Sequence, residues 1–173
     1  MLNENIEKAI NEQINAEIYS AYLYYSMSAY FESINLEGAA SWMRSQAAEE
    51  LTHAHKFFTY VNDRGGQVLL TALNGPPTEW ESPLATFQAA YEHEVHVTSL
   101  INALVTLALK ENDHTTNNFL QWFVAEQIEE EATADSIVQK LKRVTDSPSG
   151  LFMVDQELGQ RTFVMPPDLA GAA

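Results

Sequence analysis

Glutamates that interrupt helical patterns of apolar side chains are the residues best suited to chemistry. Glu17, Glu50, Glu94 and Glu130 each take a position at which the helical repeat predicts a core residue. His53 follows Glu50 by three residues, so both side chains project from one face of a helix. A buried carboxylate is costly unless a partner offsets its charge. The pattern therefore predicts a cationic partner inside the protein.

Metal ions are the expected partners, because the apolar faces carry no Lys or Arg near these glutamates. Oxygen ligands with one imidazole suit iron or manganese better than structural zinc. Glu50 lies between the two expected metal positions and is the natural bridging ligand. The residues thus predict a dinuclear metal centre. The alternative is a purely structural bundle in which a different helical phase exposes the acids to water.

The elements that must hold these side chains are helices. Gly and Pro are scarce, with 7 and 6 residues in a chain of 173, and apolar residues recur at helical spacing. The predicted helices span residues 6–33, 39–64, 83–111 and 116–144, with a short fifth helix over 149–158. Ser-Pro pairs at 82–83 and 147–148 are typical of helix starts.

The lengths of the connections predict how the helices are arranged. Short links join the first helix to the second and the third to the fourth, which favours antiparallel hairpins. The central link of about 16 residues reaches roughly 50 Å when extended, and a long helix here measures roughly 40 Å. We therefore expect an all-α, four-helix bundle with one long crossover. It occupies residues 1–160 with the fifth helix, followed by a C-terminal tail over 161–173.

The four glutamates also agree in height along the predicted bundle. Counted from the helix ends, each hairpin brings its two glutamates to within about one turn of each other. Four carboxylates and one imidazole would then converge near the middle of the bundle.

Composition excludes several classes of protein. With 24 acidic and 9 basic residues, the net charge of −15 repels phosphate backbones, so we expect no nucleic-acid partner. The chain has no cysteine, which excludes disulfides, Cys-zinc sites and thiol catalysis. No apolar stretch is long enough to span a membrane. The N-terminal sequence lacks the order of a signal peptide, so we expect a cytoplasmic protein.

These motifs resemble those of the non-haem bacterial ferritins, within the ferritin-like di-iron carboxylate family. The resemblance covers roughly residues 3–158 and rests on Glu17, Glu50-Leu51-Thr52-His53, Glu94 and Glu126-Gln127-Ile128-Glu129-Glu130. It implies an iron-storage subunit with ferroxidase activity, which oxidises Fe²⁺ with O₂ or H₂O₂ and stores ferric mineral. It also implies a homo-oligomeric cage of 24 subunits.

The resemblance assigns roles to individual residues. The implied ferroxidase residues are Glu17, Glu50 and His53 for the first iron and Glu50, Glu94 and Glu130 for the second, with Gln127 close by. Tyr24 matches the family's tyrosine beside the centre, and its plain alternative is a core aromatic. A third iron site toward the cavity is implied for Glu49, Glu126 and Glu129, with Glu130 shared. The alternative for that acidic run is a solvated helix face.

Two departures separate the chain from neighbouring families. Bacterioferritins carry a haem-ligating Met where this chain has Leu51, so we expect no haem. The fourth helix offers Glu126 and Gln127 with Glu130 where bacterioferritins and rubrerythrins have Glu-x-x-His, which favours a site that releases its iron. The rival function is a di-iron oxidase or peroxidase of the rubrerythrin or bacterioferritin type, acting without mineral storage.

Overall fold

The computed structural model describes residues 2–164, and its regular elements are helices. These are α1 (Glu4–Ser33), α2 (Glu37–Asp63), α3 (Pro83–Lys110), α4 (His114–Val144) and α5 (Pro148–Leu158). The helix starts lie a few residues from the predicted ones. At α4, Asp113 serves as the N-cap, so the helix begins inside the stretch predicted as a turn.

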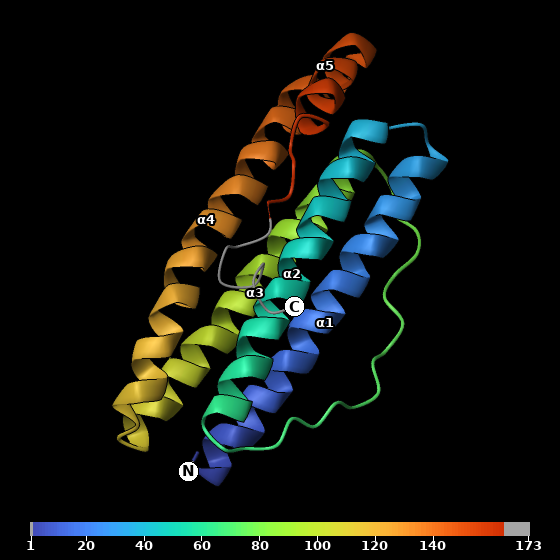
Figure 1. Ribbon diagram of the computed structural model, residues 1–173. Coiled ribbons are helices and arrows are strands. Elements are labelled where there is room, and N and C mark those ends of the chain that lie inside the picture. The colour runs from blue at the N-terminus through green and yellow to red at the C-terminus, as the bar shows by residue number, and fades with distance from the viewer. Residues whose placement is uncertain (1, 165–173) are drawn as a thin grey trace.

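The helices form two antiparallel hairpins, α1 with α2 and α3 with α4 (Figure 1). The crossover between α2 and α3 runs beside α1 from one end of the bundle to the other, so α2 and α3 point the same way. α5 lies at one end and packs on α2 and α4. This arrangement confirms the predicted four-helix bundle with one long crossover and a short fifth helix.

Side chains of α1 hold the crossover in place. The side-chain amide of Asn11 donates to the carbonyl oxygen of Gln67 at 3.0 Å and accepts from the N–H of Leu69 at 2.6 Å. Asn15 accepts from the N–H of Thr71 at 3.0 Å in the same way. Because these asparagines satisfy backbone groups that form no secondary structure, the long link follows a defined path along α1.

Most helices begin at a polar cap. The side chains that accept hydrogen bonds from first-turn N–H groups are Asn3, Ser82, Asp113 and Ser147. The cap residue of α2, Leu36, has no such side chain. Instead, the Asp155 carboxylate of α5 accepts from the N–H of Ala39 at 2.8 Å. The fifth helix therefore supplies the missing cap of the second.

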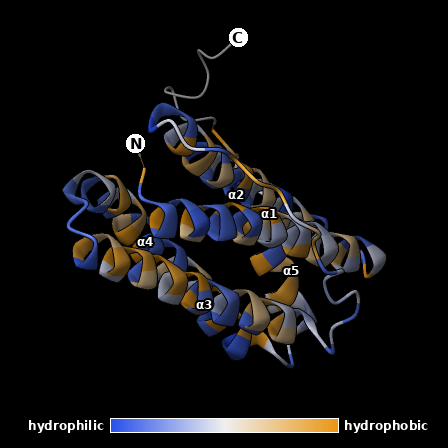
Figure 2. Ribbon diagram, turned by 90° about the horizontal axis from the view of Figure 1, so that it is seen from below, coloured by the Kyte–Doolittle hydropathy of each residue, from blue (hydrophilic) through white to orange (hydrophobic). Residues whose placement is uncertain are grey.

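The apolar core is divided into two clusters. One lies toward α5 and includes Phe31, Met43 and Phe87, and the other lies toward the start of α1 and includes Ile10 and Phe57. Every helix carries both hydrophilic and hydrophobic residues along its ribbon (Figure 2). On each long helix, the predicted metal-binding residues fall between the two clusters in sequence. The core is thus interrupted by a polar layer at mid-length.

Of the predicted tail over 161–173, the structure describes residues 161–164, which are not helical, and residues 165–173 lie outside the described part. Within residues 2–164, none of the helices combines the length and hydropathy that a bilayer span requires.

The contact between α5 and α2 predicts an effect of Gly38→Ala. A Cβ atom at Gly38 would lie 1.8 Å from the carbonyl oxygen of Asp155, so α5 must move away. We expect the free energy of unfolding to fall by about 1–3 kcal/mol, seen as a lower thermal midpoint by circular dichroism. Gly75→Ala is the control, because its Cβ would meet nothing within 4 Å. Equal midpoints in the two variants would contradict the close contact.

Candidate metal centre

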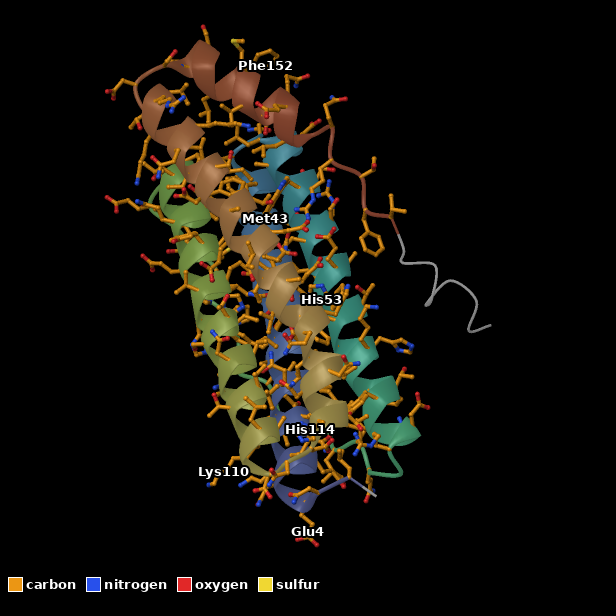
Figure 3. The ribbon with its side chains drawn as sticks, turned by 90° about the vertical axis from the view of Figure 1, so that its left-hand side faces the viewer. Glu4, Met43, His53, Lys110, His114 and Phe152 are labelled. Atoms are coloured by element: carbon orange, nitrogen blue, oxygen red, sulfur yellow. The ribbon has the colours of Figure 1, made fainter. Side chains whose placement is uncertain are left out.

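The polar layer at mid-length contains the ionisable residues that the sequence singles out. Glu17 and Glu50 are each 1% exposed, and Glu94, Glu130 and His53 are also buried. In Figure 3, His53 lies near the middle of the bundle's length, far from Phe152 at one end and Lys110 at the other. The four glutamates and His53 that the sequence singles out are therefore all buried.

Two groups of ligand atoms lie close enough to share a metal ion. The ligand atoms of Glu17, Glu50 and His53 are within 4.8 Å of one another, and so are those of His53, Glu126 and Glu130. Within the first group, His53 Nδ1 lies 3.4 Å from a Glu50 oxygen. His53 belongs to both groups, so its ring lies between the α1 side and the α4 side of the layer.

Among residues 2–164, Glu94 is in neither group and is instead held by two side chains. The Tyr24 hydroxyl donates a hydrogen bond to one of its oxygens. Gln127 Nε2 donates to the other at 3.3 Å and also to the Glu94 carbonyl oxygen at 3.2 Å. Tyr24 belongs to the buried core as well. Both sequence interpretations of this tyrosine therefore apply at once.

The residues predicted for a third site lie beside this layer with different degrees of exposure. Glu126 is half-buried near His53 and Glu130, while Glu129 is exposed. Burial raises the pKa of Glu126, and the charges of Glu129 and Glu49 raise it further. The Glu49 carboxylate accepts a hydrogen bond from Arg161. The acids are thus electrostatic neighbours, and one of them is already paired.

Two buried glutamines that the sequence analysis did not single out contact the carboxylates. Gln13 Nε2 donates to Glu17 at 2.7 Å. Gln46 Nε2 donates to Glu130 at 2.7 Å and to Glu50 at 3.3 Å. Each glutamine stands four residues before a glutamate of the layer, one helical turn away. This spacing is the sequence signal that could have identified them.

Burial and mutual repulsion raise the pKa values of the buried carboxyl groups in the metal-free chain. Burial, followed by the charge of Glu50, raises the pKa of Glu17 to about 8. Burial and the charge of Glu94 raise the pKa of Glu130 to about 7. The same causes raise the pKa of Glu50 well above its ordinary value, and burial raises that of Glu94. Among residues 2–164, the buried side chains include His53 but no Lys or Arg that could neutralise these carboxyl groups.

One carboxylate oxygen of the layer has no hydrogen-bond partner. This atom, Oε2 of Glu17, is buried and accepts no hydrogen bond from the described residues. Buried polar atoms are nearly always satisfied, so an unpartnered carboxylate oxygen beside Glu50 and His53 is suited to bind a cation. Oxygen-rich groups with one imidazole can bind two divalent cations and exchange protons as the cations bind.

The raised pKa of Glu17 predicts how stability depends on pH in the metal-free protein. In the unfolded chain this carboxyl loses its proton near 4.5, but in the folded chain it keeps the proton up to about pH 8. Between these values the folded state binds more protons, so stability falls as pH rises and is lowest above pH 8.

Glu17→Gln removes this group and should flatten the fall: at pH 8 the free energy of unfolding should rise by on the order of a few kcal/mol, seen as a higher thermal midpoint. The measurement is thermal unfolding of chelator-treated protein from pH 5 to pH 9. Glu12→Gln is the control, since Glu12 lies on the same helix with its side chain 69% exposed. Parallel pH profiles for both variants would show that Glu17 is not the titrating group.

Comparison with known proteins finds relatives of this chain in one protein family. A family model described as a ferritin-like domain matches residues 7–144. The chain is 47% identical over 161 residues to a bacterial non-heme ferritin of Bacteroides fragilis, covering 93% of this chain and 100% of the relative. It is 40% identical over 158 residues to a bacterial non-heme ferritin of Escherichia coli, covering 91% of this chain and 96% of the relative.

Solved structures agree with these matches. An open-pore ferritin from the archaeon Archaeoglobus fulgidus is 54% identical and superimposes with a TM-score of 0.93, covering 94% of this chain and all of that one (100%). A closed form of the same ferritin, engineered by site-directed mutagenesis, is 54% identical with a TM-score of 0.94, covering 95% of this chain and 100% of that one. The chain therefore belongs to the ferritin family.

Proposed function

We propose that this chain is a subunit of an iron-storage ferritin with ferroxidase activity. It oxidises Fe²⁺ with O₂ or H₂O₂ at the buried centre, and the ferric product is stored as mineral inside a cage of 24 identical subunits. One observation carries the proposal: Glu17, Glu50 and His53 bring their ligand atoms within 4.8 Å of one another, and the buried side chains among residues 2–164 include no Lys or Arg. The non-heme ferritin relatives support iron as the metal.

Iron is the substrate of this centre, and we assign it two binding positions. The first Fe²⁺ binds Glu17, Glu50 and His53, whose ligand atoms already form one group. The second binds Glu50, Glu94 and Glu130, with Gln127 beside it. Glu50 bridges the two ions, in keeping with the position of its carboxylate next to both His53 and Gln46. Tyr24 holds the Glu94 carboxylate by its hydrogen bond.

The chemistry is a two-electron oxidation shared by two ions. Each Fe²⁺ gives up one electron, and O₂ takes both with two protons to form H₂O₂. Alternatively, H₂O₂ takes both electrons with two protons to form two molecules of water. The carboxylates fix the distance between the ions, and their negative charge stabilises Fe³⁺ more than Fe²⁺. Because the centre holds protons when metal-free, binding iron releases them at neutral pH.

A third iron position lies beside this pair, toward the exposed edge of the layer. It uses Glu49, Glu126 and Glu129 with Glu130 shared, on the edge of the layer where exposure rises. An acidic path from buried to exposed carboxylates gives the oxidised ions a route out of the centre. The net charge of −15 also suits a cavity that gathers cations.

Three further expectations belong to this proposal and stay predictions. The first is a cytoplasmic location, by analogy with the ferritin family. The absence of haem follows from Leu51, which is 45% exposed on α2. The closed assembly of 24 subunits follows from the family relationship.

Glu50→Ala and Glu130→Ala test the centre. Each removes a carboxylate from the second iron position, and Glu50→Ala also removes the bridge, so rapid Fe²⁺ oxidation should fall by at least about 100-fold, as for loss of a ligand or its support. Stopped-flow absorbance after aerobic addition of Fe²⁺ measures the rate. Glu12→Ala, on the exposed face of α1, should oxidise iron as the wild type does. Wild-type rates in either centre variant would refute the assignment.

Storage is tested separately from oxidation. The apoprotein receives Fe²⁺ in air in large excess and is then run on a sizing column with iron and protein detection. We expect iron far in excess of the binding sites to elute with a particle close to half a megadalton, because oxidised iron leaves the centre and accumulates in the cage. About two retained irons per chain in a small oligomer would favour the di-iron oxidase instead.

A further inference from the structure

Arg161, which follows α5, reaches back to the edge of the metal centre. Its Nη1 donates to Gln46 Oε1 at 2.7 Å, and its Nη2 donates to the Glu49 carboxylate. The guanidinium carbon lies 4.5 Å from the centroid of the Trp42 ring. The chain that leaves α5 turns back along the bundle (Figure 1, Figure 3). Three contacts with residues of α2 therefore define the position of the Arg161 guanidinium.

Gln46 connects Arg161 to the buried carboxylates. A guanidinium can only donate hydrogen bonds, so the carbonyl oxygen of Gln46 must face Arg161. The amide nitrogen then faces inward, where it donates to Glu130 and Glu50. Arg161 thus fixes which way the Gln46 amide points, although it does not itself enter the buried layer.

Glu49 connects Arg161 to the proposed third iron position. The charge of Glu49 raises the pKa of both Glu126 and Glu130, so its carboxylate lies within electrostatic reach of the other acids there. The guanidinium stays charged at all physiological pH values. It therefore offsets the charge of Glu49 at every physiological pH for as long as the contact lasts. A divalent cation that approaches the same carboxylate is repelled by the positive charge beside it.

We propose that Arg161 is a tethered cation that competes with a third divalent cation for Glu49. The inference rests on the third iron position of the proposed function and adds its regulation. A cation binds at Glu49 only when Arg161 leaves, and the segment 159–164 shifts from α2 at the same time. Binding of this cation is therefore weaker than binding at the two buried positions, and it is coupled to the placement of the chain after α5.

The test is a calorimetric titration of the assembled, metal-free protein with Zn²⁺, which does not change its oxidation state. In the wild type we expect two tight sites per chain and a weaker third. Arg161→Gln should tighten the third site about tenfold or more, because the competing charge is gone. Arg44→Gln is the matched control: Arg44 is itself a residue of α2, and its guanidinium pairs with Glu32 of α1 at 2.6 Å on an exposed face. It should bind Zn²⁺ as the wild type does.

A double-variant cycle identifies Glu49 as the contested group. Glu49→Gln should weaken or remove the third site, and adding Arg161→Gln to it should change nothing further. A gain in the double variant equal to that in Arg161→Gln alone would show that Arg161 acts elsewhere, and would overturn the inference.

Fluorescence gives a second readout that does not depend on affinity. In a Trp80→Phe, Trp122→Phe background, Trp42 is the remaining tryptophan. Its emission should change as the third equivalent of Zn²⁺ displaces the guanidinium from the ring, and Arg161→Gln should lack this change. An unchanged Trp42 signal in the protein that retains Arg161 would mean that the cation binds without displacing it.

The outcomes separate this inference from the proposed function. Two tight Zn²⁺ sites with an equal third site in wild type and Arg161→Gln, or with none in either, overturn the competition but keep the buried centre. A weaker third site in Arg161→Gln also overturns it, since Arg161 would then support the cation. Loss of the two tight sites themselves would overturn the proposed function, and the inference with it.

Discussion

The rest of the structure depends on one electrostatic constraint: several carboxylates that repel one another are buried in one layer between two apolar clusters. Burial and repulsion raise the pKa values of Glu17 and Glu130 to about 8 and about 7. Such a layer is tolerable only in a scaffold that holds each carboxylate in place. The four long helices provide that scaffold, because Phe31 and Phe87 pack on one side of the layer and Ile10 and Phe57 on the other.

Uncharged hydrogen-bond donors hold the buried carboxyl groups in place. Gln13, Gln46 and Gln127 donate through side-chain amides, and Tyr24 donates through its hydroxyl. These groups orient the carboxyl groups without adding a positive charge to the layer. A lysine or arginine within the layer would form ion pairs that an incoming metal ion must break. Neutral donors therefore suit a centre that takes up cations and passes them on.

The C-terminal part of the chain is connected to this centre through α2. Asp155 caps the start of α2, and Gly38 allows α5 to approach closely. With α5 held there, Arg161 comes within reach of Gln46 and Glu49. The placement of the fifth helix thus has an electrostatic consequence about three turns along α2, at the edge of the carboxylate layer.

The sequence by itself determined the bundle, its crossover and the layer of Glu17, Glu50, Glu94 and Glu130, because the direction of a side chain on a helix follows from local spacing. It also showed Gln13 and Gln46 one turn before two of these glutamates, but that spacing is equally common on solvated faces. Only the tertiary structure decided that His53 lies near Glu126 as well as Glu17, and that Arg161 reaches Glu49. Those contacts join residues far apart in the chain, and they exist only where packing of whole helices brings the side chains together.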